Sequence, residues 1–268
     1  MNRAISNIAW PDDVKLADIS SILHKHGIAG IECAPAKMKH DCGIDCTFKE
    51  MKSVYGDLGF SIPAFQAILF GHNEFQVFDK STHAAFLEHI KLISSFAEDA
   101  GAHVLVFGAP KNKIHHSTLL DGALDTACSF FRKAGDVVKD FGCIIGVEAN
   151  PREYNCNFLT TTDEARRFVK MVDSPYVALH IDTGTIEVNH EDFQREVSRC
   201  DFCHFHLSAP FLNNIADSSF DNSAAVDLLS RIKYDRWLSI EMKKPENPVD
   251  YKMHIERALS SAFGRIEE

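Results

Sequence analysis

The feature that most constrains this chain is an alternation of short apolar runs with longer amphipathic segments. The apolar runs have the length and composition of buried strands, and the segments between them have the spacing of helices. We expect strands at residues 4–9, 30–33, 61–69, 103–107, 143–148, 177–182, 202–206 and 237–241. We expect helices at 13–26, 48–58, 82–100, 117–141, 161–172, 191–198, 221–232 and 249–263.

Eight strands that alternate with eight helices predict a wholly parallel sheet. Eight is also the number of strands that closes such a sheet, so the fold class expected is α/β, a single (β/α)8 TIM barrel. No linker or low-complexity tract divides the chain, and we expect one domain over residues 1–268. Residues 183–192, TGTIEVNHED, are interpreted as a longer loop on the functional face.

The charge balance argues against a nucleic-acid partner. Lys and Arg number 28 and Asp and Glu number 38, which gives a net charge of −10, whereas nucleic-acid phosphates require basic side chains. The first residues lack the pattern of a signal peptide, and no apolar run reaches the roughly 18 residues that span a membrane. We therefore expect a cytoplasmic protein with no membrane partner and with its eight cysteines reduced. The sequence is also compatible with a homodimer.

Four potential metal ligands end four successive apolar runs in the second half of the chain: Glu148, Asp182, His206 and Glu241. In a parallel barrel the carboxyl ends of all strands open onto one face. Three carboxylates and one imidazole that meet there would suit one divalent metal ion, Mn, Mg or Co, and less strongly Zn. The alternative is a salt bridge in the barrel mouth, because a buried carboxylate needs a partner of some kind.

Further polar residues near strand ends are candidates for substrate binding: Glu32, Lys37, Gln66, His72, Lys111, Asn150, Arg152, His180 and His204. Strand alternation places His204 on the face of His206, and Cys203 and Phe205 on the other face. The basic residues among them, together with Lys113, could hold a phosphate or carboxylate group. A solvated surface position is the alternative for each of these basic residues.

Three sequence segments support a family resemblance: GIAGIECAP at 27–35, IPAFQAILFG at 62–71 and EANPREYNCNF at 148–158. Together with the ordered set Glu148, Asp182, His206 and Glu241, they make the chain resemble the xylose isomerase-like TIM-barrel superfamily. This superfamily contains sugar isomerases and epimerases and also endonuclease IV. The resemblance covers essentially the whole chain.

The resemblance implies roles for the strand-end residues. In the family's epimerases, typified by D-tagatose 3-epimerase, the glutamates matching Glu148 and Glu241 bind the metal and also move protons. The family motif D-x-x-H, whose histidine reaches the substrate, reads Asp182-Thr183-Gly184-Thr185 here, so that histidine is missing.

The resemblance therefore implies a divalent-metal-dependent isomerase or epimerase of a sugar or sugar phosphate. Proton transfer next to a carbonyl would proceed through a metal-stabilised enediolate. Two alternatives stay open. One is a metal-dependent phosphodiester hydrolase like endonuclease IV, for which the chain offers an incomplete ligand set; the other is a non-catalytic sugar-binding barrel.

Overall fold

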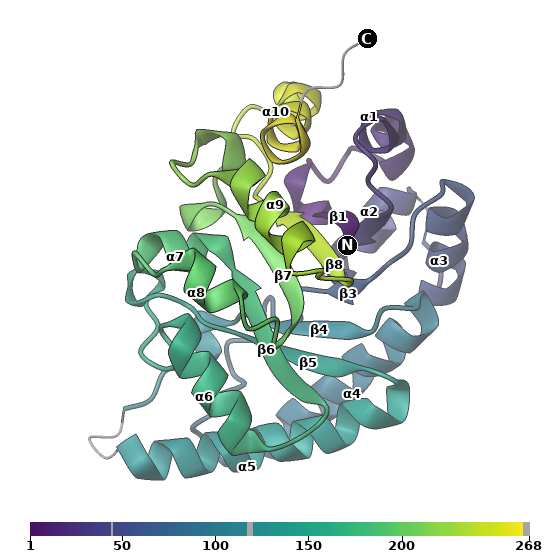
Figure 1. Ribbon diagram of the computed structural model, residues 1–268. Helices are drawn as coiled ribbons and strands as arrows, with labels where there is room; N and C mark the ends of the chain where they lie inside the picture. The colour runs from purple at the N-terminus through teal and green to yellow at the C-terminus, as the bar shows by residue number, and fades with distance from the viewer. Residues whose placement is uncertain (44, 117–119, 265–268) are drawn as a thin grey trace.

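Parallel strands form the centre of the molecule, and helices cover their outer side (Figure 1). The computed structural model describes residues 1–43, 45–116 and 120–264. Within these residues the strands are β1 (Asn2–Ser6), β2 (Gly30–Glu32), β3 (Ala64–Phe65), β4 (Val104–Phe107), β5 (Ile144–Glu148), β6 (Val177–Asp182), β7 (Phe202–Ser208) and β8 (Trp237–Glu241).

The strands pair in the order β2-β1-β8-β7-β6-β5-β4-β3, and every pairing is parallel. Single bridges from Gly30 to Ser61 and from Cys33 to Phe65 join the two ends of this order. The backbone amide of Ile31 donates to the carbonyl of Ser61 at 2.9 Å across the same seam. The sheet therefore closes, and the predicted single (β/α)8 TIM barrel is confirmed.

The helices that follow the strands vary in length. The α-helices of the described residues are α1 (Ser20–Lys25), α2 (Met38–Cys42), α3 (Phe48–Asp57), α4 (His83–Ala100), α5 (Leu120–Val138), α6 (Thr162–Val172), α7 (Thr183–Val188), α8 (Phe193–Val197), α9 (Asn222–Arg231) and α10 (Tyr251–Phe263). Short 3₁₀ helices are η1 (Asn7–Ala9), η2 (Leu16–Asp18), η3 (Pro35–Lys37), η4 (Pro110–Asn112), η5 (Lys139–Phe141), η6 (Arg152–Tyr154), η7 (Pro210–Leu212), η8 (Ile215–Asp217) and η9 (Pro248–Asp250).

Several expectations about elements were wrong in detail. The segment 183–192 is not a loop throughout, because Thr183–Val188 forms α7. Asp182 caps this helix, and its Oδ1 accepts a hydrogen bond from the Thr185 amide at 2.6 Å. The expected strand 4–9 ends at Ser6 and continues as η1, and the expected strand 61–69 contracts to Ala64–Phe65. Of the expected helix 117–141, residues 117–119 lie outside the described residues.

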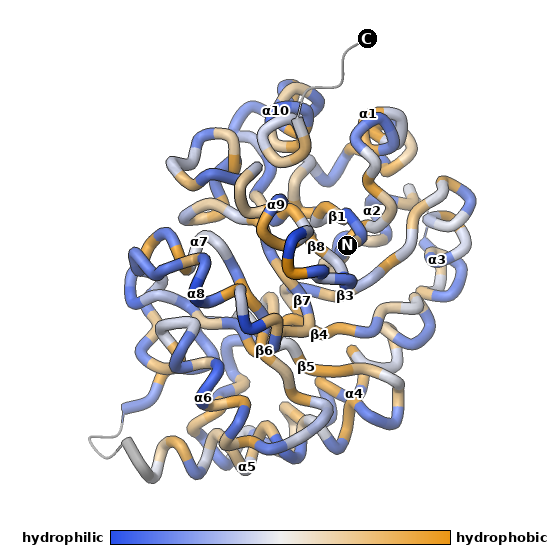
Figure 2. Tube along the Cα trace, viewed as in Figure 1, coloured by the Kyte–Doolittle hydropathy of each residue, from blue (hydrophilic) through white to orange (hydrophobic). Residues whose placement is uncertain are grey.

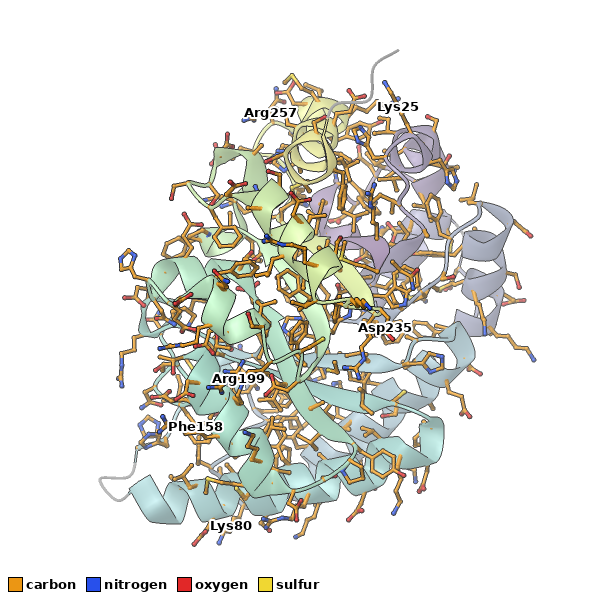
Figure 3. All side chains as sticks on the ribbon, in the orientation of Figure 1. Lys25, Lys80, Phe158, Arg199, Asp235 and Arg257 are labelled. Atoms are coloured by element: carbon orange, nitrogen blue, oxygen red, sulfur yellow. The ribbon has the colours of Figure 1, made fainter. Side chains whose placement is uncertain are left out.

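Most of the apolar core lies between the strands and the helices, where large aromatic side chains pack. The ring of Phe131 lies 4.9 Å from that of Phe107 and 5.2 Å from that of Phe168, measured between centroids. Figure 2 shows the strands as mostly hydrophobic and the helices as mixed, as expected for helices with one solvated face. Charged side chains such as Lys25 and Arg257 stand on the outside (Figure 3).

The barrel interior has its own small cluster of buried residues, Ala64, Val104, Val106 and Cys203. Cys203 was expected on the opposite face from His204, and this expectation was wrong. The pairing of β6 with β7 shifts register, so that Leu179 pairs with Phe202 and the next residue, His180, pairs with His204. The extra residue is a bulge, and it lets both Cys203 and His204 face the interior.

Candidate metal centre and active site

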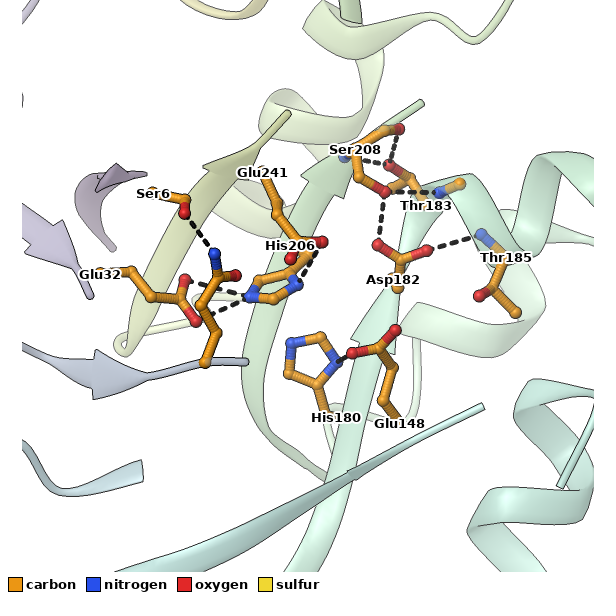
Figure 4. Close-up of polar contacts among 12 residues, drawn as sticks. Ser6, Glu32, Glu148, His180, Asp182, Thr183, Thr185, His206, Ser208 and Glu241 are labelled. Atoms are coloured by element: carbon orange, nitrogen blue, oxygen red, sulfur yellow. Dashed lines mark hydrogen bonds and ion pairs between the residues drawn. The ribbon is translucent and has the colours of Figure 1, made fainter. Parts of the chain in front are cut away.

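Three of the four strand-end ligands meet at the carboxyl ends of adjacent strands (Figure 4). Asp182, His206 and Glu241 each offer one ligand atom, and these atoms all lie within 4.8 Å of one another. Asp182 ends β6, His206 lies near the end of β7, and Glu241 ends β8. Parallel pairing of β6 with β7 and of β7 with β8 therefore brings them together. We call these three residues the outer group.

Asp182 is held in place by two donors. Its Oδ1 accepts from the Thr185 amide at 2.6 Å, and its Oδ2 accepts from the Ser208 hydroxyl. Ser208 is in turn fixed by Thr183, because its amide donates to Thr183 Oγ1 at 2.8 Å. Burial, and after it the charge of Glu241, raises the pKa of Asp182 despite these hydrogen bonds. Each carboxylate oxygen still has a free lone pair that a cation could use.

His206 lies between two glutamates. Its Nε2 donates to Glu32, with Oε1 at 2.9 Å and Oε2 at 3.0 Å. Its Nδ1 lies 3.1 Å from Glu241 Oε2, but without the alignment of a hydrogen bond. Burial alone would lower the pKa of His206, yet the charges of Glu32 and Glu241 outweigh it and raise the pKa well above its usual range. Because Nε2 bonds Glu32 and Nδ1 lies near Glu241, Nδ1 is the nitrogen that faces the outer group.

Glu148 ends β5 and lies beside the outer group without joining it among the described residues. Its Oε1 accepts from Asn150 Nδ2 at 3.1 Å, and its Oε2 lies 3.8 Å from His180 Nδ1. Burial, followed by the charges of Asp182 and Glu241, raises the pKa of Glu148 well above its usual range. The carboxyl group therefore holds a proton at higher pH than an exposed glutamate does.

The position of the Glu148 carboxylate also depends on the residue that follows β4. A Cβ atom at Gly108 would lie 2.2 Å from Glu148 Oε2, so the carboxylate occupies space that only a glycine leaves free. On the other side, Lys113 is buried, and its Nζ donates to the carbonyl oxygen of Glu148 at 2.7 Å. Burial lowers the pKa of Lys113.

The structure brings five of the nine substrate-binding candidates close to the site. Glu32 contacts His206, and His204 Nε2 lies 3.2 Å from Glu32 Oε2. His180 packs against His206 with ring centroids 4.1 Å apart, and Asn150 bonds Glu148. Gln66 is buried at the end of β3, where its Nε2 donates to Ser6 Oγ.

The other four candidates are engaged elsewhere. Lys37 is buried, and its Nζ lies 3.2 Å from the Pro11 carbonyl and 3.5 Å from Asp41 Oδ1. His72 Nδ1 lies 2.8 Å from Glu74 Oε1 in a half-exposed position. Lys111 and Arg152 are exposed. Among the described residues, the four basic side chains expected to hold a phosphate or carboxylate share no common partner: Lys37, Lys111, Lys113 and Arg152.

Ser208, Thr183 and the room left by Gly108 were not anticipated from sequence. A signal for Ser208 existed, because it lies two residues after His206 and strand alternation keeps such residues on one face. Thr183 carried no such signal, since its contact with Ser208 joins residues 25 positions apart. The role of Gly108 depends on where the Glu148 side chain turns, which the sequence alone does not show.

The outer group has the chemistry of a divalent metal site. Asp182 and Glu241 place two carboxylates beside the His206 imidazole, and the Glu148 carboxylate lies next to them. Burying several like charges is costly without a cation. Oxygen ligands with one histidine suit Mn²⁺, Mg²⁺ or Co²⁺, and Zn²⁺ also accepts them. In the described residues no helix is both long and apolar enough to cross a membrane.

Solved structures with this fold include a sugar epimerase and an endonuclease. D-psicose 3-epimerase from Clostridium cellulolyticum H10, solved with D-tagatose, has a TM-score of 0.75 at 15% identity, with 98% of this chain and 96% of that chain covered. AP endonuclease, family 2, from Brucella melitensis has a TM-score of 0.74 at 16% identity, with 92% and 95% covered. The IolI protein, solved with a zinc atom, has a TM-score of 0.73 at 16% identity, with 98% and 95% covered.

At these identities the similarity concerns the fold. A family model adds the sequence evidence, because it matches residues 21–260 of the chain. That match spans nearly the whole barrel, including all four strand-end ligands. The chain belongs to the xylose isomerase-like TIM barrel family.

Proposed function

We propose that this protein is a divalent-metal-dependent isomerase or epimerase that acts on a sugar or sugar phosphate. The observation that carries the proposal is the meeting of Asp182, His206 and Glu241 on the catalytic face, with Glu148 beside them. The fold shared with D-psicose 3-epimerase supports the choice of substrate class.

Glu148, Asp182, His206 and Glu241 would hold the ion. The outer group offers three ligand atoms, and a turn of the Glu148 carboxylate away from His180 would add the fourth. The fit rests on the buried carboxyl groups of Asp182 and Glu148, whose pKa values are raised by burial and by neighbouring carboxylates, and on an imidazole whose Nδ1 has no hydrogen-bond partner among the described residues. When bound, such an ion supplies Lewis-acid polarisation of a substrate carbonyl.

Glu148 and Glu241 would move the proton. They end β5 and β8, which are separated in the sheet by β6 and β7, so the two carboxylates reach the site from different sides. A general base works best when its pKa lies near the working pH, and the surroundings of Glu148 shift its pKa in that direction. Proton return to the opposite face of the same carbon gives epimerisation, and proton return to the adjacent carbon gives aldose–ketose isomerisation.

Substrate contacts would come from polar groups around this centre. Asn150, His180 and Glu32 lie next to the proposed ligands. Thr185, which stands where the family motif has histidine, does not take over that histidine's role. Its hydroxyl donates to the Ala149 carbonyl at 3.0 Å, and its side chain is buried. Substrate recognition must therefore differ from that of family members that have D-x-x-H.

The proposal is tested by solvent exchange on a panel of ketoses and aldoses, free and phosphorylated, with Mn²⁺, Mg²⁺, Co²⁺ or Zn²⁺ added. We expect deuterium from D₂O to enter the carbon beside the carbonyl of one substrate. Asp182→Asn should abolish this exchange. Absence of exchange on every sugar, in protein that elemental analysis shows to hold metal, would reject the proposal in favour of a sugar-binding barrel.

A further inference from the structure

A second group of ligand-type side chains lies deeper in the barrel than the outer group. His180, His204 and His206 each offer a ring nitrogen, and these three atoms lie within 4.8 Å of one another. All three side chains are at most 1% exposed. With Glu32, which is also fully buried, we call them the inner group.

Glu32 links two of these histidines. Its Oε2 lies 3.2 Å from His204 Nε2, and its Oε1 lies 2.9 Å from His206 Nε2. Two ligand atoms bound to one tetrahedral zinc ion at about 2.0–2.2 Å stand roughly 3.4 Å apart. The two separations from Glu32 are close to that value. The three imidazole nitrogens lie within 4.8 Å of one another, so a shared ion would draw the histidine rings closer together.

His180 supplies an independent observation. Both of its ring nitrogens are buried and have no hydrogen-bond partner among the described residues. The closest acidic oxygen, Glu148 Oε2, is 3.8 Å from Nδ1, which is too far for a hydrogen bond. Figure 4 shows the His180 ring between Glu148 and the side of the barrel that carries Glu32. A buried imidazole without partners is costly, so a bound species that satisfies it is expected.

We propose that the inner group is a second divalent metal site, formed by three imidazoles and one carboxylate. His206 would belong to both sites as an imidazolate, with Nδ1 toward the outer group and Nε2 toward the inner group. The Nε2 proton that now bonds Glu32 would be released to solvent when the ion binds. Three nitrogen ligands and one oxygen ligand suit Zn²⁺ better than Mg²⁺ or Mn²⁺. The proposed sugar chemistry needs one ion, so this second ion goes beyond it.

The experiment counts zinc ions in the full chain. The protein is saturated with Zn²⁺, freed of unbound metal, and examined by elemental analysis and by anomalous X-ray diffraction at the zinc edge. We expect two ions per chain, with one anomalous peak among His180, His204 and Glu32. His180→Leu and His204→Gln should each lower the count from two to one.

Matched variants separate the two sites. Asp182→Asn should lower the count to one and leave the inner anomalous peak in place. His204 has no contact with Glu148 or Asp182 among the described residues, so His204→Gln should leave the outer peak in place. Circular dichroism melting confirms that each variant is folded. One ion in the wild type, or two ions retained in both histidine variants, would overturn the inference and leave buried water as the partner of His180.

The metal count does not depend on turnover. Two ions without exchange on any sugar would uphold the inner site and reject the proposed function. One ion together with exchange would support the proposed function and reject the inner site.

Discussion

At the scale of single residues, the carboxylates in the barrel mouth are in contrasting surroundings. Burial opposes ionisation of Glu32, but His206 and His204 outweigh it and hold its pKa well below the usual range. Glu148 has carboxylates as its main charged neighbours, and burial together with their charge raises its pKa. Glu32 is thus suited to orient an imidazole, whereas Glu148 is suited to exchange a proton or to be neutralised by a cation.

The first prediction concerns the two glutamates proposed as bases. Glu148→Gln and Glu241→Gln should each lower solvent-deuterium incorporation by at least about 10²-fold, because the amide keeps the shape but cannot accept the proton. Metal content is measured in the same samples. A variant that keeps both metal and full exchange would show that its glutamate serves only as a ligand.

The second prediction concerns pH. The pKa values of Glu148, Asp182 and His206 are all raised, so protons compete with a metal at higher pH than usual. Metal affinity should therefore rise with pH and be lost as pH falls through these raised values, by up to about tenfold per pH unit for each proton displaced. Calorimetry in buffers of different ionisation enthalpy measures both the affinity and the protons released. An affinity that stays constant between about pH 5 and pH 8 would contradict the assignment.

At the scale of elements, the ends of the strands prepare the site. The end of β4 leaves room for the Glu148 side chain at Gly108, and the start of α7 directs the Thr185 amide at Asp182. The helix that follows β6 therefore both terminates the strand and orients a ligand, since a helix amino terminus presents unpaired amides to a carboxylate.

The third prediction tests the space at Gly108. In Gly108→Ala the new Cβ would lie 2.2 Å from Glu148 Oε2, and the flexible carboxylate would have to move. We expect a folded protein whose deuterium exchange falls by roughly 10-fold or more, since small displacements of catalytic groups are costly.

The matched control is Gly122→Ala in α5, where a Cβ meets nothing within 4 Å. That change should leave exchange unaltered and stabilise the helix by up to about 1 kcal/mol. Equal exchange in both variants would mean that the position of Glu148 is not limiting.

At the scale of the whole molecule, the net charge of −10 argues against a nucleic-acid partner. Phosphate contacts dominate the affinity of DNA-binding proteins and need clustered cations. Here two lysines near the barrel mouth, Lys37 and Lys113, are buried and bonded to the protein itself.

The fourth prediction follows from this charge. Binding to duplex DNA that contains an abasic site should be negligible at physiological salt, and incision should be absent with any of the four metals. A gel-based incision assay and fluorescence anisotropy at two salt concentrations measure both quantities. Salt-sensitive tight binding, or incision, would make the phosphodiester hydrolase the leading function.

The sequence by itself determined the barrel and the positions of the candidate metal ligands along it. Hydrophobic periodicity is a local property, so eight alternations could be read without knowing any contact, and parallel strands necessarily bring their carboxyl ends to one face. The convergence of Asp182, His206 and Glu241 follows from these two facts. Their roles as metal ligands and bases stay a prediction.

Only the tertiary structure decided how those side chains are held. Glu32 reaches His206 across 174 positions of sequence, and the register shift beside Leu179 turns Cys203 into the interior. The turn of Glu148 toward Gly108 and the capping of α7 by Asp182 likewise depend on neighbouring strands and loops. The physical reason is that side-chain rotamers and strand register respond to partners that barrel closure supplies, and local sequence patterns carry no record of those partners.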